Sequence, residues 1–248
     1  MWDLRFVICE SEWNVESLLD LRRVDPESWR RLLKLFDKLS TVPPEGDPEC
    51  KRSIMEVTRW YEERSQAMCR NAIDHISGAW SAMHRDWMEF LDEVFKQRCL
   101  TQEPVTCCLG LSLLSPRNLS GRLFGIPFYV AIGRQLSTCA HEILHFRYFE
   151  WLATHYPGIS RDQYNYPHEA WLVSEIVAAV LSHHPFAVEL FGPGPDACYA
   201  CPTPLFQRAL DLCPSKQSSK LDFKGFYEQL CLLVATKNLD QAPARFSQ

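Results

Sequence analysis

The sequence lacks several features that mark particular classes of protein. It has no basic surplus, because 26 Lys and Arg stand against 31 Asp and Glu, for a formal net charge of −5. Proteins that bind nucleic acid usually carry a basic face, so no nucleic-acid partner is expected. The chain also has no internal repeat and no low-complexity tract. With 46% hydrophobic and 23% charged residues among 248, it has the composition of a globular protein with a sizeable core.

Long apolar runs are also absent. No stretch approaches the roughly 18 to 20 apolar residues that a membrane-spanning helix needs, and Ile176–Leu181 is far too short. The N-terminal residues MWDLRFVICESEWN contain no basic segment followed by a long apolar stretch, so no secretory signal is indicated. These two absences predict a cytoplasmic protein with no membrane partner.

Cysteine, in contrast, is plentiful, with 11 residues. In a chain without a signal peptide, this odd number favours reduced, mostly buried thiols over a disulfide framework. Cys198 and Cys201 form a CxxC pair. A structural zinc site needs two further ligands, but only Cys213 follows soon after and no second CxxC exists. Simple packing or a thiol pair is therefore the favoured interpretation.

Three segments are predicted to form a small mixed sheet. Apolar and polar residues alternate in Leu4–Cys9, as in a half-buried strand. Val105–Leu114 is apolar and begins with residues that favour strands, which predicts a buried strand. The third segment is Leu123–Ile132, where Pro127 points to a sheet edge or a bulge, since proline cannot donate to a ladder.

The rest of the chain is predicted to be mainly helical. Between Pro48 and Pro104, apolar residues recur every three, four or seven positions, which predicts one very long amphipathic helix or two that break at Ser77–Gly78. Further helices are predicted over Val15–Leu39 (split at Pro26), from Ser137 or Thr138 to His155, and over His168–His183, Pro204–Leu212 and Phe223–Thr236. The sequence thus predicts an α+β fold in a single domain, 1–248. Its parts are the N-terminal helices and sheet, 1–136, two active-site helices, 137–185, and the C-terminal helices, 186–248.

The motif that carries chemistry is HEILH, residues 141 to 145. Residues four apart lie on one face of a helix, so His141 and His145 can bind one metal ion through their imidazoles. Glu142 lies about 100° further round the helix, where its carboxylate can take a proton from a metal-bound water. The simpler interpretation is two histidines on an ordinary amphipathic helix. We predict a Zn²⁺ site.

A zinc site needs a third protein ligand, and Glu175 is the leading candidate. It is a lone carboxylate in the apolar segment AWLVSEIVAAVLS, where a charge is costly unless it is paired or bound to a metal. The short connection to the preceding helix predicts antiparallel packing, which would bring Glu175 to the histidines. The alternative is an ion pair between Glu175 and Arg147 or Arg134. The competing third ligands are His168, Glu169, His183, His184 and Glu189.

This pattern resembles the gluzincin branch of the zincin metallopeptidases. HEILH is followed 30 residues later by a glutamate on a helix and preceded by a predicted strand, so the resemblance covers about Leu123–Leu181. It implies a zincin-like fold, with His141, His145 and Glu175 as zinc ligands and Glu142 as general base. It also implies a substrate peptide lying along Leu123–Ile132. The metzincin extension is absent, because Tyr148 and Trp151 stand at its Gly and His positions. A fainter resemblance is to ImmA/IrrE-type peptidases.

The expected activity is zinc-dependent hydrolysis of peptide bonds in a peptide or protein substrate. The oxyanion that develops needs a donor besides zinc, and the candidates are Tyr164, Tyr166 and His168, with His155 as a weaker one. One alternative is a zincin-fold regulator or peptide-binding module that keeps the metal without proteolysis. The other is a helical structural protein with a chance motif, in which His141 and Glu175 would lie far apart.

Overall fold

The protein is mostly helical and carries one small mixed sheet, as the α+β prediction states. The computed structural model describes residues 4–101, 103–112, 116–194, 196, 198, 200–213 and 222–236. The strands are β1 (Leu4–Ile8), β2 (Val105–Gly110), β3 (Arg117–Asn118) and β4 (Leu123–Pro127). The helices are α1 (Ser11–Val24), α2 (Pro26–Leu35), α3 (Cys50–Phe95), α4 (Ile132–His155), α5 (Glu169–Leu181), α6 (Pro185–Phe191), α7 (Thr203–Leu212) and α8 (Phe223–Ala235), with short 3-10 turns η1 (Asp37–Thr41) and η2 (Arg161–Tyr164).

The described chain divides into two compact units. One lies within residues 81–103 and 140–236, and the other within residues 4–80 and 104–139. The first holds the end of α3, most of α4 and all later helices, whereas the second holds α1, α2, the start of α3 and the sheet. The prediction of a single domain over 1–248 stays a prediction.

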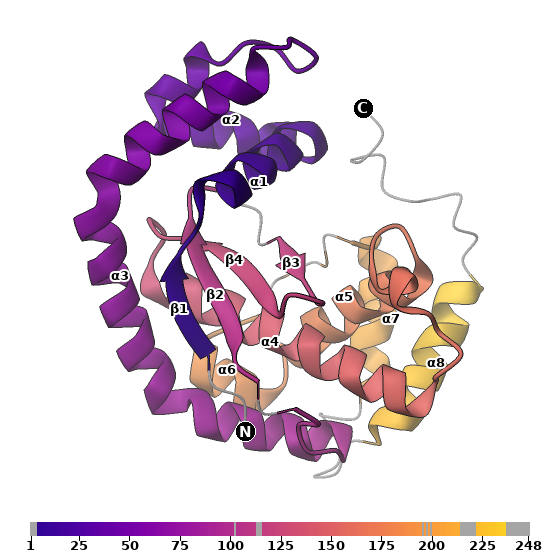
Figure 1. The fold of residues 1–248 in the computed structure, drawn as a ribbon. Coiled ribbons are helices and arrows are strands. Elements are labelled where there is room, and N and C mark those ends of the chain that lie inside the picture. Colours follow the sequence, from indigo (N-terminus) through magenta and orange to yellow (C-terminus); the bar gives the residue numbers. More distant parts are fainter. Residues whose placement is uncertain are drawn as a thin grey trace. The chain divides into compact units, whose positions relative to one another are not determined.

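The sheet belongs to the second unit and has the strand order β1-β2-β4-β3 (Figure 1). β1 pairs with β2 and β2 pairs with β4 in parallel, and β3 pairs with β4 antiparallel. The prediction that β4 is an edge strand is therefore wrong. Arg117 and Asn118 return alongside Phe124 and Leu123, and the Gly125 amide donates to the Pro116 carbonyl at 2.9 Å. This short partner occupies the side of β4 that was expected to receive a peptide.

The boundary between β4 and α4 also differs from the prediction. The strand ends at Pro127 and the helix begins at Ile132, within the segment Leu123–Ile132 that was predicted as strand. The Gln135 side chain closes this corner by donating to the carbonyls of Pro127 at 3.0 Å and Phe128 at 3.1 Å. Thr138, one of the two residues predicted to begin the helix, lies inside it and donates to the Arg134 carbonyl.

Other helix boundaries follow the sequence closely. The break at Asp25–Pro26 is confirmed, since Asp25 ends α1 and its carboxylate accepts the Ser28 amide at the start of α2. α3 is one continuous helix through Ser77 and Gly78.

Helix α6 was not predicted; His184 caps it by accepting the Phe186 amide. The predicted end of the second strand, Leu114, lies outside the described residues.

Alanine is expected to have opposite effects on stability at two glycines of the second unit. A Cβ on Gly110 would meet Asn14 Oδ1 at 2.2 Å, and that oxygen accepts the Leu111 amide at 3.0 Å, whereas a Cβ on Gly78 would meet nothing within 4 Å. Gly110→Ala should lower the free energy of unfolding by about 2 kcal/mol through overpacking and a displaced hydrogen bond. Gly78→Ala, in a helix interior, should raise it by about 0.5–1 kcal/mol. Urea denaturation followed by circular dichroism measures both, and equal shifts for the two variants would contradict the packing around Gly110.

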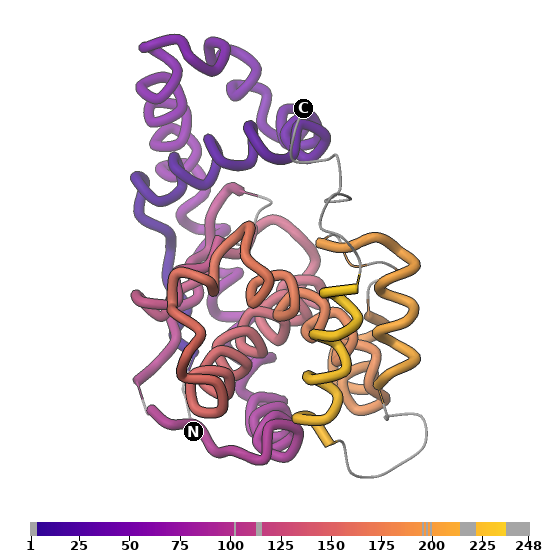
Figure 2. The backbone as a smooth tube through the Cα atoms, turned by 90° about the vertical axis from the view of Figure 1, so that its right-hand side faces the viewer, coloured from indigo at the N-terminus to yellow at the C-terminus, as the bar shows by residue number. Residues whose placement is uncertain are grey.

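The helices of the first unit surround α5. Residues Val173 to Leu181 of α5 are all buried, and α5 contacts η2, α7 and α8. Figure 2 shows α7 in orange and α8 in yellow running side by side. Because residues Val173 to Leu181 are buried, a polar group on this part of α5 lies in the interior of the unit. Of the described helices, no single one is long and apolar enough to cross a membrane; one bent pair, 161–181 with 185–191, passes on length and composition only.

Candidate metal centre

Helix α4 presents the two motif histidines on one face. Their rings meet edge to face with centroids 4.6 Å apart, and the two Nε2 atoms lie 3.0 Å from each other. This is the geometry that the spacing of four residues predicts for a helix. The His145 ring is fully buried and lies nearly parallel to the Phe149 ring, one turn further along α4. Packing therefore fixes the orientation of at least one of the two imidazoles.

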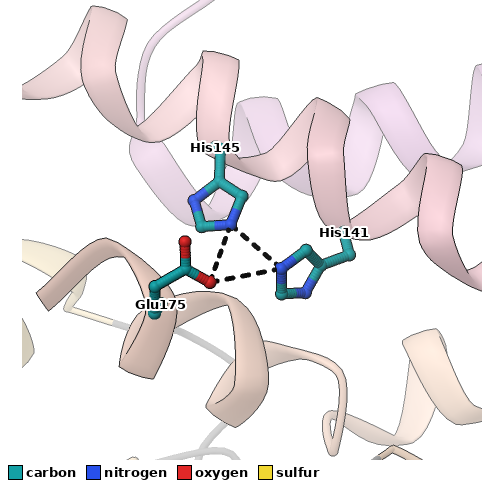
Figure 3. A group of neighbouring side chains, drawn as sticks. All are labelled: His141, His145 and Glu175. Carbon is teal, nitrogen blue, oxygen red and sulfur yellow. Dashed lines mark hydrogen bonds and ion pairs between the residues drawn. The ribbon is translucent and has the colours of Figure 1, made fainter. Parts of the chain in front are cut away.

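Glu175 on α5 faces the same point (Figure 3). Its Oε2 atom lies 3.5 Å from His141 Nε2 and 3.4 Å from His145 Nε2. The side chain is 2% exposed. In such surroundings a carboxylate is costly unless positive charge stands beside it. A divalent cation between the three side chains, or a proton on one imidazole, would supply that charge.

The spacing of the three ligand atoms matches zinc. A tetrahedral zinc ion with bonds of about 2.05 Å holds any two of its ligand atoms about 3.3 Å apart. The three separations here are 3.0, 3.4 and 3.5 Å. Two imidazole nitrogens and one carboxylate oxygen are also a donor set that zinc accepts. The donor types and their spacing thus fit a zinc ion.

Access to this group of atoms is one-sided. The His145 side chain is 0% exposed and Glu175 2%, whereas the His141 side chain is 28% exposed. Among the described residues, the only group of three or more His, Cys, Asp or Glu whose ligand atoms converge is His141, His145 and Glu175. Three protein ligands leave the fourth position of a tetrahedral ion open, and His141 marks the side from which solvent reaches it.

The ion pairs seen for Arg147 are with carboxylates other than Glu175, its alternative partner in the sequence analysis. The buried Arg147 guanidinium instead contacts Asp92 Oδ1 at 2.6 Å, Glu150 Oε2 at 3.0 Å and the Gln97 carbonyl. These contacts tie α4 to the end of α3 within the first unit. Arg134 is exposed near the start of α4. The Arg147 partner Asp92 lies 55 residues away in the sequence, so no local sequence signal could have identified that ion pair.

The competing third ligands lie elsewhere. His168 is exposed at the N-cap of α5, and Glu169 is exposed in its first turn. His183 Nδ1 lies 2.9 Å from the Ala179 carbonyl. His184 stacks beside Phe90, and burial lowers the pKa of its imidazole. Glu189 is exposed on α6. None of the five belongs to the converging group found among the described residues.

The residues predicted for catalysis differ in their surroundings. Glu142 is buried on α4, directly after His141. Tyr164 is buried and its ring stacks on Phe149 at 4.5 Å, which in turn lies against His145. Tyr166 is 53% exposed and meets Trp171 edge to face. The roles assigned to Glu142, Tyr164, Tyr166 and His168 stay predictions.

The cysteines are all free thiols, as predicted, and nine of the 11 are buried. Cys198 and Cys201 are both buried, and a hydrogen bond with Cys201, followed by burial, raises the pKa of the Cys198 thiol. Neither belongs to a metal-binding group among the described residues. The CxxC is therefore a buried thiol pair, in line with the favoured interpretation.

Comparison with known proteins gives no match from which the chemistry of this centre could be inferred. No family model matches the chain, and neither the curated proteins nor the solved structures contain a significant match. The site is therefore interpreted from its own geometry.

Proposed function

We propose that the chain is a zinc-dependent peptidase with His141, His145 and Glu175 as its metal ligands. The observation that supports this most strongly is the convergence of three donor atoms at separations of 3.0 to 3.5 Å. Three protein ligands with an open fourth position are typical of catalytic zinc sites, whereas structural sites are closed by four. The partial exposure of His141 gives a substrate a side from which to approach.

Glu142 is the proposed general base. A zinc ion held by the triad would lower the pKa of a bound water to about 7 and polarise a substrate carbonyl. Glu142 would take a proton from the attacking water and deliver it to the leaving amine. Its neighbour His141 is a ligand, so the motif itself brings the carboxylate close to the reacting atoms. A site that only held zinc would have no need for this carboxylate.

The fold-level part of the proposal is a zincin-like arrangement of the gluzincin type. It is supported by the order along the chain of strand β4, the HEILH helix α4 and the glutamate helix α5. The proposal no longer includes a substrate peptide pairing along Leu123–Ile132, because β3 lies on that side of β4 and the strand ends at Pro127. A metal-binding regulator without proteolysis is the second candidate, and the activity test below separates the two.

The proposed function predicts metal-dependent cleavage of peptides. The zinc-loaded chain should hydrolyse members of a mixed peptide library, lose that activity after dialysis against a chelator, and regain it with one equivalent of zinc. Mass spectrometry of the products identifies the cleaved bonds. A chain that holds one zinc ion per molecule and cleaves no peptide would support the regulator instead. A chain that takes up no zinc would contradict both.

A further inference from the structure

The unit that holds the metal ligands also contains a cavity of about 300 Å³ at some distance from them. It is lined by Phe95, Lys96, Trp151, His155, Asp222, Phe223 and Lys224. His155 follows His145 by ten residues on α4, which places it about 15 Å further along the helix axis. The cavity is therefore separate from the candidate metal centre, and its volume is at the lower end of the range for small-molecule sites.

The base of this cavity is aromatic and rigid. Phe95, Trp151 and Phe223 are each 2% exposed. The Phe223 ring meets the other two edge to face, at 4.5 Å from Phe95 and 4.7 Å from Trp151. Rings locked in this way form a fixed apolar layer at the bottom of the cavity, beneath the exposed His155 ring.

His155 forms a flat wall above this base. Its ring stacks on Trp151, with centroids 4.6 Å apart and an angle of 22° between the planes. Nδ1 lies 2.9 Å from the Trp151 carbonyl. Because a carbonyl oxygen only accepts, Nδ1 carries the proton in this contact, which leaves Nε2 as an acceptor in the neutral ring and a donor in the protonated one. A flat group can stack against this ring and still meet a polar atom.

The rim carries an excess of positive charge. Lys96 is exposed, has a left-handed backbone with φ of 50°, and makes no ion pair with any residue that the structure describes. Lys224 lies in the first turn of α8, and its ion pair with Glu228 is long, at 3.9 Å, and exposed. The Asp222 carboxylate accepts the Gly225 amide and so caps α8. Among the lining residues, two lysines stand against one aspartate, and a long, exposed ion pair such as Lys224–Glu228 is weak, so both lysines can contact a ligand with one negative charge.

We propose that this cavity is a second binding site, for a small aromatic carboxylate. The flat group of the ligand would lie against His155 and the aromatic base, and its carboxylate would face Lys96 and Lys224. The lysines of the rim would bind the carboxylate of such a ligand, and the aromatic residues below them would contact its flat ring. This site does not depend on the proposed peptidase activity, because none of its seven lining residues belongs to the metal centre.

The test is an NMR titration of the full chain with three probes: 2-naphthoate, its neutral analogue 2-naphthalenemethanol, and acetate. The reporters are the Trp151 indole N–H and the His155 ring protons. Naphthoate should shift the resonances of both reporters until they saturate. The neutral analogue and acetate should each bind at least about fivefold more weakly than naphthoate, since a charge-assisted contact contributes on the order of 1 kcal/mol. Binding of the neutral analogue as tight as that of naphthoate would overturn the assignment of the rim, and no shift with naphthoate would overturn the site.

Three variants and a matched control sharpen the result. Lys96→Met and Lys224→Met should each weaken naphthoate binding about fivefold, because each removes one positive charge from the rim. Asp222→Asn should tighten it, because asparagine still caps the helix but lacks the negative charge. Lys34→Met removes an exposed lysine of α2 and should change nothing. If the three rim variants behave like Lys34→Met, the carboxylate does not bind here.

Discussion

Glu175→Ala should remove stoichiometric zinc from the protein. The Glu175 carboxylate lies 3.4 to 3.5 Å from both imidazole nitrogens, so it would supply the third ligand atom of the proposed zinc site. Loss of an outer-shell partner typically weakens metal affinity 10- to 100-fold, and loss of a direct ligand should weaken it by more than about 100-fold. Zinc content by mass spectrometry and affinity by competition with a chelating dye measure the change.

A second substitution and a matched control make this result specific. Glu175→Gln keeps the shape of the side chain in its buried position and should weaken zinc binding in the same direction, which separates loss of the ligand from a cavity in α5. Glu189→Gln removes an exposed carboxylate that the sequence had offered as a rival ligand, and it should bind zinc like the wild type. Equal zinc affinity in Glu175→Gln, Glu189→Gln and the wild type would exclude Glu175 from the centre.

Glu142→Gln should retain zinc and lose peptide hydrolysis. Glutamine has nearly the same shape as glutamate but cannot accept a proton from water, and general base catalysis contributes roughly 10²- to 10⁴-fold to a rate. The expected result is therefore a fall in kcat of that size, with one zinc ion still bound per chain. Steady-state cleavage of the best substrate from the peptide library, together with zinc analysis, measures both quantities.

The control for Glu142 is Glu169→Gln, which changes an exposed carboxylate in the first turn of α5. Its kcat should stay within about twofold of the wild type, since surface substitutions away from a site have small effects. If Glu142→Gln cleaves peptides as fast as Glu169→Gln, a different group accepts the proton, and the role of the motif glutamate would have to be given up.

The candidate metal centre could be predicted from the sequence because its signals are local. Two histidines four residues apart must share a helix face, and a single carboxylate within an apolar helix needs a positive partner. Both statements follow from His141, His145 and Glu175 without knowledge of the fold. The structure brings their ligand atoms to within 3.5 Å of one another, and a chance motif on distant helices would not have done so.

The features that the sequence did not predict depend on contacts between distant residues. Pro127 marked β4 as an edge, but the strand β3 that pairs with it is only two residues long, too short to be indicated by the sequence. Ser137 and Thr138 looked like helix caps, yet Gln135 reaches back to the end of β4 and α4 starts at Ile132. A prediction from the propensities of single residues takes no account of such side-chain contacts. It therefore places the start of the helix at the nearest residue that commonly caps helices.

Arg147, in the unit that holds the proposed metal ligands, is another residue whose contacts could not be predicted from the sequence. Its charge and its place two residues after His145 made it a reasonable partner for Glu175. In the structure its buried guanidinium contacts the partly exposed carboxylates of Asp92 and Glu150. A buried arginine needs several acceptors, and only the packing of α4 against the end of α3 shows where they come from.

The central claim is that one zinc ion lies between the two imidazoles and the carboxylate. X-ray anomalous scattering at the zinc absorption edge, from crystals of the wild-type chain grown with zinc, tests it most directly. The account predicts one strong peak about 2.0–2.2 Å from Nε2 of His141, Nε2 of His145 and a carboxylate oxygen of Glu175. Crystals that show no anomalous peak between these three side chains, with zinc elsewhere or nowhere in the protein, would contradict it.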